Sequence, residues 1–297
     1  MIKKEPNKDN ESEIYINKDE ANIYKASIDK NEESWNKETY NAWVERLGEP
    51  KEAANRIKNN PEKVLSVIYG KIEGVQGKKI MNLMGSNGNK AVALGLLGAE
   101  VTVVDFSEGN KRYAEDLARE AGVSINYILS DVLKMPREVF TGDYDIVFAE
   151  MGIIHYFIDL KPFINIMKRL LKPNGRLIIR DFHPVTTKLI SSRGSTAKVR
   201  KHKVTGDYFD TSLEEKEVAY SKYLDEGEEV HKVLLRRWNL GEVVTAVAKE
   251  GLFITSLDEE ANLSSEVFDK GIPKTFTLVA EKKIIKDDYP RYEEFIF

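Results

Sequence analysis

Short apolar runs recur along the chain and alternate with segments that have helical spacing of apolar residues. Seven runs have the length of buried strands: residues 80–84, 101–104, 125–129, 144–149, 176–180, 252–257 and 275–280. Apolar residues recur at helical spacing at 91–97, 107–122, 160–171 and 240–250. Strands and helices in this alternation predict an α/β fold. We expect a three-layer sandwich around a mostly parallel, seven-stranded sheet.

Two segments depart from this alternation. Before the first strand, aromatic residues near 35–47 have near-helical spacing, and Asn60-Pro61 opens a further helix, which predicts an N-terminal helical cap. After the fifth strand, residues 217–224 and 230–238 predict an inserted β-hairpin around the turn 225–228. The predicted organisation is a tail and helical cap (1–76), a core (77–183 and 240–284), an insertion or lid (184–239) and a C-terminal tail (285–297).

The segment from Lys79 to Ser107 predicts a strand, a glycine-containing turn, a helix and a second strand that ends at an acidic residue. The turn Gly85-Ser86-Asn87-Gly88 has a glycine at each end, and glycine tolerates positive φ. Such a turn leaves backbone N–H groups free at a helix N-terminus, where an anionic group is favoured. Asp105 ends the next strand at the same sheet edge, where a carboxylate can accept both hydroxyls of a ribose. The alternative is a plain βαβ turn with a solvated aspartate.

The glycine spacing bears on which nucleotide would bind. A dinucleotide site has the pattern G-x-G-x-x-G, and the pair Gly85 and Gly88 does not supply it. This disfavours NAD. S-adenosylmethionine has a ribose and an amino-acid carboxylate but no phosphate, so it needs no pyrophosphate cradle.

These landmarks, in this order, resemble a class I S-adenosylmethionine-dependent methyltransferase. The family motif (D/E)-x-G-x-G-x-G aligns with residues 82–88: Gly88 keeps its place, and Asn82, Met84 and Ser86 replace the acid and the first two glycines. Residues 145–150 match the family's fourth strand, and 170–182 match its turn and fifth strand. The resemblance implies S-adenosyl-L-methionine as cofactor, with Asp105 at the ribose and Asp131 at the adenine amine. The expected cofactor-binding residues are Asn82, Gly85, Ser86, Gly88, Asp105, Phe106, Asp131, Val132 and Glu150.

Methyl transfer from a sulfonium needs alignment and, for some acceptors, removal of a proton. His155 follows the fourth predicted strand and is the first candidate base, because imidazole titrates near neutrality. It could instead hydrogen-bond the cofactor or a helix end. His183, two residues after Asp181, is the second candidate.

Acceptor specificity is expected in the two segments outside the core. The bulky aromatics of the cap either wall a pocket or pack on the sheet. The hairpin carries a mixture suited to a polar, partly planar molecule, at Tyr220, Tyr223, Arg236, Arg237 and Trp238. Alternatively, it forms a homodimer interface or merely extends the sheet. We expect cap and insertion to close over the acceptor. The expected substrate-binding residues are Trp35, Tyr40, Trp43, Tyr156 and Arg236.

Composition narrows the class of function. A net charge of −4 over 297 residues gives no general attraction to nucleic acid, and a basic segment at 188–203 is expected to be a solvated surface unless it meets an anionic substrate or RNA. The absence of cysteine excludes disulfides and thiolate metal sites, and no metal is expected. No apolar run is long enough to span a bilayer, so we expect a cytoplasmic protein without a membrane partner.

The sequence therefore predicts an enzyme that methylates a small molecule, at an oxygen, nitrogen or carbon atom. The Asn/Asp-Pro-Pro-aromatic motif of nucleic-acid amino-methylating enzymes is absent, and residues 150–153 read Glu-Met-Gly-Ile instead. Two alternatives remain open: an NAD-dependent oxidoreductase, and an S-adenosylmethionine-binding protein without catalysis.

Overall fold

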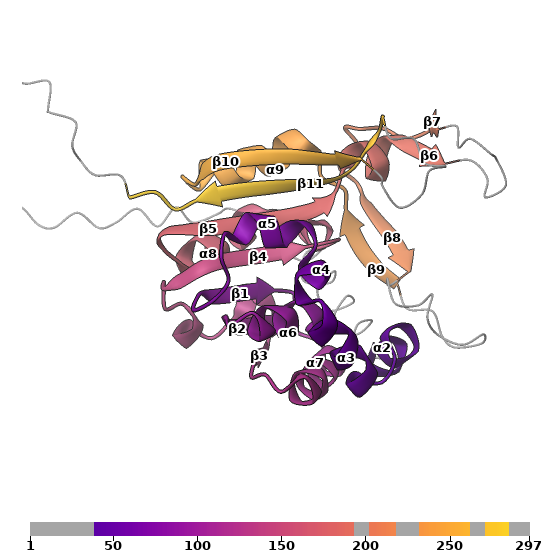
Figure 1. Ribbon diagram of the computed structural model, residues 1–297. Helices are drawn as coiled ribbons and strands as arrows, with labels where there is room; N and C mark the ends of the chain where they lie inside the picture. The colour runs from indigo at the N-terminus through magenta and orange to yellow at the C-terminus, as the bar shows by residue number, and fades with distance from the viewer. Residues whose placement is uncertain (1–38, 193–201, 218–231, 262–270, 285–297) are drawn as a thin grey trace, which may run out of the picture.

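The computed structural model describes residues 39–192, 202–217, 232–261 and 271–284. Its centre is a seven-stranded sheet in the order β10-β11-β5-β4-β1-β2-β3 (Figure 1). The strands are β1 Lys79–Leu83, β2 Glu100–Asp105, β3 Asn126–Leu129, β4 Tyr144–Glu150, β5 Leu171–Phe182, β10 Phe253–Ala261 and β11 Pro273–Glu281. Neighbouring strands are parallel except at β11, which is antiparallel to both β5 and β10. The predicted mostly parallel sheet is confirmed.

Helices cover both faces of this sheet, as the apolar strands require. Along β4, Ile146 and Phe148 face one apolar cluster, and Val147 and Ala149 face the other, because successive side chains of a strand point to opposite faces. One face carries α2 Thr39–Leu47, α3 Pro50–Asn59, α4 Pro61–Leu65, α5 Val67–Ile72, α6 Asn89–Leu96 and α7 Glu108–Ala121. The other carries α8 Lys161–Leu170 and α9 Leu240–Lys249. This is the expected three-layer sandwich.

The helices begin and end at residues whose chemistry the sequence displays. The Ser107 side chain accepts a hydrogen bond from the backbone N–H of Asn110 and so caps α7, which ends at Gly122 in the left-handed conformation. Asn239 and Glu242 form a capping box at the start of α9. Short 3-10 turns lie at η1 Val132–Lys134, η2 Arg137–Val139 and η3 Ile154–Tyr156.

The N-terminal helices are part of the main core. Trp43 of α2 and Ile57 of α3 belong to the same buried cluster as Ile80 and Val103 of the sheet. Figure 1 shows α2 to α5 on the same side of the sheet as α6 and α7. The cap is therefore anchored to the sheet through continuous apolar packing.

The insertion after β5 differs in detail from its prediction. It contains two antiparallel pairs, β6 Ile190–Ser192 with β7 His202–Val204 and β8 Leu213–Glu217 with β9 Lys232–Arg236. A hairpin is confirmed, but its first strand begins before the predicted 217–224, and Tyr220 and Tyr223 lie outside the described residues. None of the described helices is long and apolar enough to cross a membrane.

Part of the basic segment at 188–203 is not the solvated loop that its composition predicts. A π-helical turn, η4 Val185–Leu189, leads into β6. Lys188 in this turn is buried, and its ammonium donates hydrogen bonds to the carbonyl oxygens of Asp210 and Arg237, the second at 2.9 Å. Because these carbonyls satisfy the buried ammonium, Lys188 joins two parts of the insertion.

Candidate functional site

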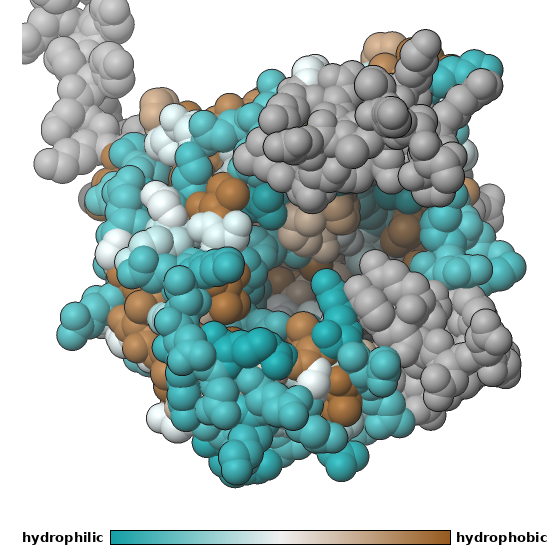
Figure 2. All heavy atoms as spheres, turned by 45° about the vertical axis from the view of Figure 1, so that its right-hand side comes forward, coloured by the Kyte–Doolittle hydropathy of each residue, from teal (hydrophilic) through white to brown (hydrophobic). Residues whose placement is uncertain are grey.

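A cavity of about 470 Å³ lies where β1, β2, β4 and β5 end. This is the carboxyl edge of the sheet, where open α/β folds bind their ligands, and the volume is that of a small-molecule site. Figure 2, turned so that this side of the molecule comes forward, shows a hollow with hydrophobic atoms at its floor. The lining residues are Trp43, Arg46, Met84, Ser86, Asp105, Phe106, Asn110, Glu150, Met151, Gly152, Ile153, His155, Tyr156, Phe182, Glu217, Val233, Leu235 and Arg237.

The turn after β1 adopts an unusual backbone. Met84, Ser86 and Gly88 have φ of 50°, 49° and 74°, in the left-handed region that glycine tolerates best. These are the three positions at which the aligned family motif has glycine, so the conformation is kept where two of the glycines are lost. Gly85 does not have the expected positive φ. It must be glycine for space, because a Cβ there would lie 2.6 Å from Oδ1 of Asn82.

Asp105 ends β2 at the wall of the cavity and is 7% exposed. Its Oδ2 accepts the backbone N–H of Ser86 at 3.0 Å, and its Oδ1 accepts the backbone N–H of Ser107 and the side-chain amide of Asn110, both at 3.0 Å. Burial raises the pKa of Asp105, and the bond from Asn110 and those from the backbone oppose that rise. These bonds, together with one from the backbone N–H of Phe106, hold the carboxylate rigidly at the wall of the cavity.

Asn110 lines the cavity and was not predicted. Its Oδ1 accepts the indole N–H of Trp43 at 2.7 Å, while its amide donates to Asp105. Trp43 therefore lines the cavity with its N–H already bound, and the α2 helix is tied to the acid at the end of β2. The sequence offered one indication of this role: Asn110 lies in the first helical turn after the cap residue Ser107, close to the end of β2.

Glu150 ends β4 and lines the same cavity. Its Oε1 lies 2.8 Å from Nζ of Lys90, near the start of α6. Its Oε2 is buried and has no hydrogen-bond partner among the described residues. This half-satisfied carboxylate is able to receive a cationic or N–H group from a ligand.

His155 lies in η3, 3% exposed. Its Nδ1 is 3.1 Å from the carbonyl oxygen of Arg236, and because a carbonyl only accepts, Nδ1 carries the proton. Nε2 is then the basic nitrogen, and within the described structure it has no hydrogen-bond partner. Burial lowers the pKa of His155, while the carboxylate of Asp181 acts in the opposite direction. The imidazole is neutral near pH 7. Its Nε2 lies 3.7 Å from Oδ1 of Asp181.

Asp181, fully buried in β5, fixes the loop that carries His155. Its Oδ1 accepts the backbone N–H of Gly152 at 2.7 Å, and its Oδ2 accepts those of Ile153 at 2.9 Å and Ile154 at 3.1 Å. One side chain of the fifth strand thus sets the path of the chain after the fourth. The result is an imidazole placed by its backbone and held in one tautomer.

The structure brings some of the expected site residues together at this cavity and leaves others outside. Those lining it are Trp43, Ser86, Asp105, Phe106, Glu150, His155 and Tyr156. Asn82, Gly85 and Gly88 shape the turn from β1 to α6 without lining the cavity. Asp131 and Val132 follow β3, where Asp131 accepts the N–H of Leu133 at the start of η1. Trp35 lies outside the described residues.

Three expected residues have partners away from the cavity. His183 is buried at the end of β5, with Nε2 2.6 Å from Oε1 of Glu259, and its Nδ1 accepts the N–H of Val185. The Tyr40 hydroxyl donates to Asp116 on α7 at 3.0 Å. Arg236 pairs with Glu242 at 2.8 Å and lies over the ring of Trp238.

Arg237 takes the cavity position expected of Arg236. Side chains alternate along an extended chain, so Val233, Leu235 and Arg237 share one face and all three line the cavity. Arg236 and Trp238 face the other way. The predicted arginine was therefore off by one residue, and along a strand a shift of one residue places the side chain on the opposite face.

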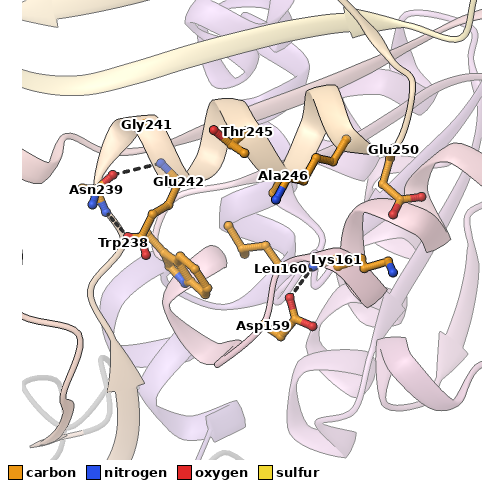
Figure 3. Close-up of a pocket in the computed structure, with 11 residues that line it drawn as sticks. Asp159, Leu160, Lys161, Trp238, Asn239, Gly241, Glu242, Thr245, Ala246 and Glu250 are labelled. Atoms are coloured by element: carbon orange, nitrogen blue, oxygen red, sulfur yellow. Dashed lines mark hydrogen bonds between the residues drawn. The ribbon is translucent and has the colours of Figure 1, made fainter. Parts of the chain in front are cut away.

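A second, more open cavity of about 800 Å³ lies beside the start of α9 (Figure 3). Figure 3 shows Trp238 and Leu160 on one side of it and the capping box of Asn239 and Glu242 at one end. Two of its carboxylates are already engaged: Asp159 accepts the backbone N–H of Lys161, and Glu250 accepts the amide of Asn165. Trp238, named above among the hairpin residues, lines it, but none of the residues expected to bind cofactor, catalyse the reaction or bind substrate does.

Comparison with known proteins gives a consistent family. Residues 84–179 match the family described as "Methyltransferase domain". The chain is 27% identical over 113 residues to the ubiquinone biosynthesis O-methyltransferase of Pectobacterium carotovorum, covering 38% of this chain and 46% of that protein. It is 29% identical over 109 residues to the demethylmenaquinone methyltransferase of Thermus thermophilus, covering 36% and 48%. The chain thus spans about half the length of these curated relatives.

A solved structure shares the fold over nearly its full length. An S-adenosylmethionine-dependent methyltransferase from Mesorhizobium loti superposes with a TM-score of 0.57 at 18% identity, over 75% of this chain and 99% of that one. At that identity the likeness speaks for the fold alone.

Proposed function

Because the core of this chain belongs to the class I S-adenosylmethionine-dependent methyltransferase family, we propose that the protein transfers the methyl group of S-adenosylmethionine to a hydroxyl group of a small aromatic acceptor. The observation that carries the choice of a hydroxyl is His155, which lines the cavity and whose buried, basic Nε2 has no hydrogen-bond partner within the described structure. A hydroxyl is the acceptor that gains most from a neutral base beside it.

The residues around the cavity fit the cofactor. The left-handed turn at Met84 to Gly88 presents backbone to a ligand in the cavity, and the Asp105 carboxylate lines the cavity where a ribose hydroxyl would bind. The buried, unpartnered Oε2 of Glu150 suits the ammonium of a methionine moiety. When bound, S-adenosylmethionine supplies a methyl group made electrophilic by its positively charged sulfur.

The proposed role of His155 is to accept the proton that the acceptor hydroxyl loses as its oxygen bonds to the methyl carbon. Bound S-adenosylmethionine would supply the methyl group and would leave as a neutral thioether that keeps the electron pair of the carbon–sulfur bond. The proton then resides on Nε2, and the Asp181 carboxylate, 3.7 Å away, favours the imidazolium electrostatically. The bond from Nδ1 to the Arg236 carbonyl keeps the basic nitrogen turned away from that carbonyl.

The walls of the cavity support an aromatic acceptor. Apolar side chains from the turn, the loop after β4, β5 and β9 line it: Met84, Met151, Phe182, Val233 and Leu235. Apolar walls with a few polar groups favour an aromatic ring. The quinone-pathway names of the relatives point to the same class of acceptor.

Two measurements test this proposal. Isothermal titration of the protein with S-adenosylmethionine and with NAD should give binding of the first alone, and Asp105→Ala should weaken it by about 10–100-fold, the scale of a hydrogen bond to a charged group. Glu115→Ala, an exposed change on α7, is the matched control and should leave affinity unchanged.

The second measurement is turnover to S-adenosylhomocysteine with a panel of phenols and their methyl ethers. Turnover is expected with phenols alone, and His155→Ala should lower the rate by about 10²–10⁴-fold with cofactor affinity preserved. Binding of NAD in place of S-adenosylmethionine would support the oxidoreductase. Cofactor binding without turnover of any phenol would refute the proposed reaction.

A further inference from the structure

Arg237 lies at the cavity wall with its binding capacity largely unused. It shares the cavity face of the β9 strand with Val233 and Leu235, and its side chain is 19% exposed. No hydrogen bond from its guanidinium to a described residue is found, and its Nε is buried without such a partner. Buried N–H groups of a guanidinium are normally satisfied, so this one calls for a ligand.

The ionic surroundings of Arg237 leave room for an anion. Its ionic partner in the described structure is Glu214, with Oε2 3.5 Å from Nε, and the Glu214 side chain is 35% exposed. Partly exposed ion pairs of this kind contribute little to stability. Glu217 lines the same cavity, and Arg46 of α2 brings a second guanidinium, 5.6 Å from the centroid of the Trp43 ring. The carboxylates of Asp105 and Glu150 are held by other partners, Asn110 and Lys90.

The backbone beside Arg237 is also fixed. Nζ of the buried Lys188 donates to the Arg237 carbonyl at 2.9 Å, and the indole N–H of Trp238 donates to the carbonyl of Ile154 at 2.9 Å. Since Arg236 accepts the Nδ1–H of His155 through its own carbonyl, the candidate base and this arginine are anchored to one short segment. A guanidinium on a fixed backbone is organised before its ligand arrives.

We propose that Arg237 binds a carboxylate on the methyl acceptor, so that the acceptor is a hydroxylated aromatic acid. The planar guanidinium offers two parallel N–H groups that match a carboxylate. The acceptor is then oriented by its two ends, with the acid at Arg237 and the hydroxyl at His155, and the apolar walls hold the ring. This inference rests on the proposed function and specifies its substrate class.

The test compares acids with their neutral amides. The protein loaded with S-adenosylhomocysteine is titrated calorimetrically with ortho-, meta- and para-hydroxybenzoate and with the three corresponding hydroxybenzamides. At least one acid should bind about 10–100-fold more tightly than its amide, as expected for a hydrogen-bonded ion pair. In Arg237→Gln that preference should fall to less than about threefold, whereas Lys232→Gln, which removes an exposed charge from the same strand, should keep it.

The wild-type comparison stands even if Arg237→Gln does not fold. Equal affinity of acids and amides, no detectable binding of either, or loss of the preference in Lys232→Gln would overturn the proposal. The proposed function is judged separately, because binding of S-adenosylmethionine and turnover of neutral phenols do not depend on the acid. A protein that binds the cofactor and methylates phenols without preferring acids would keep the function and lose this inference.

Discussion

Trp43 donates its indole N–H to Oδ1 of Asn110 at 2.7 Å, across the boundary between the N-terminal helices and the core. The amide of Asn110 in turn donates to Asp105 at 3.0 Å. The N-terminal helices and Asp105 are thus joined by two buried hydrogen bonds in series. In this arrangement the position of α2 and the orientation of the Asp105 carboxylate depend on one another.

A double-mutant cycle should detect this dependence. Trp43→Phe keeps an aromatic ring but removes the indole N–H, and Asn110→Ala removes the shared amide. Each should lower the free energy of unfolding by about 1–3 kcal/mol, because a buried group is left unpaired. The double variant should show a coupling of at least about 0.5 kcal/mol in urea denaturation.

The matched control for this cycle is Tyr40→Phe. It removes a hydroxyl bond to Asp116 outside the cavity and should leave cofactor affinity unchanged, whereas Asn110→Ala should weaken it. Strictly additive losses in the Trp43 and Asn110 variants would show that the two bonds act independently.

The alternation of strands and helices could be predicted from the sequence because both faces of the central strands are buried. Ile146 and Val147 point to opposite faces of the sheet and are both apolar. The strand therefore appears in the sequence as a continuous apolar run, whichever face each residue points to. The insertion lacks this signal. β8 reads Leu-Glu-Glu-Lys-Glu, with one apolar residue, and only its pairing with β9 identifies it as a strand. Its start was therefore misplaced.

The candidate site was predicted in part for a related reason. Residues at strand ends, such as Asp105, Glu150 and His155, are placed by the topology of the fold alone. Asn110 depends on which side of α7 faces Asp105, and the choice between Arg236 and Arg237 depends on strand phase. Neither is determined by local sequence, since both require knowing which elements lie opposite.

The buried imidazole of His155 should give the protein a defined acid dependence. Burial lowers its pKa, so between that lowered value and the ordinary value of about 6.5 the unfolded chain binds more protons than the folded one. Stability should therefore be fully retained above about pH 6.5 and should fall as the pH drops through this window. The acid limb of kcat/KM should likewise have its midpoint below about 6.5, because the neutral base persists to lower pH.

His155→Gln should remove the acid limb of the pH–rate profile and the corresponding slope in free energy of unfolding against pH. Both are measured between about pH 5 and 8, with urea denaturation for the second. An acid limb centred above about 6.5 in the wild type, or one unchanged in His155→Gln, would contradict the assigned role.

Asp181 should be among the most sensitive polar residues for stability. It accepts three backbone N–H groups of the loop after β4 and is fully buried, so Asp181→Ala leaves those donors unpaired and should cost about 3 kcal/mol or more in free energy of unfolding. Asp181→Asn keeps one acceptor oxygen, and its stability should lie between that of Asp181→Ala and that of the wild type.

The control is Asp258→Ala, which breaks an ion pair with Lys71 at a side chain that is 47% exposed. It should lower the free energy of unfolding by less than about 1 kcal/mol. Similar losses at Asp181 and Asp258 would show that the loop does not rely on the buried carboxylate.

The two glycines Gly88 and Gly122 separate the cost of backbone conformation from the cost of space. Their φ values are 74° and 75°, so alanine meets nearly the same left-handed penalty of about 1–2 kcal/mol at either position. A Cβ at Gly122 meets nothing within 4 Å, whereas at Gly88 it would lie 2.5 Å from Cβ and 3.2 Å from Cα of Ala114 on α7. Gly88→Ala should therefore lose about 1–3 kcal/mol more free energy of unfolding than Gly122→Ala, the usual cost of overpacking. Because the clash pushes α6 away from α7 at the turn after β1, Gly88→Ala should also weaken binding of S-adenosylmethionine, and Gly122→Ala should not.

Urea denaturation measures the difference in stability between the two variants, and isothermal titration measures the difference in affinity for S-adenosylmethionine. Equal stability and equal affinity would mean that the turn adapts to the added Cβ without disturbing the cavity.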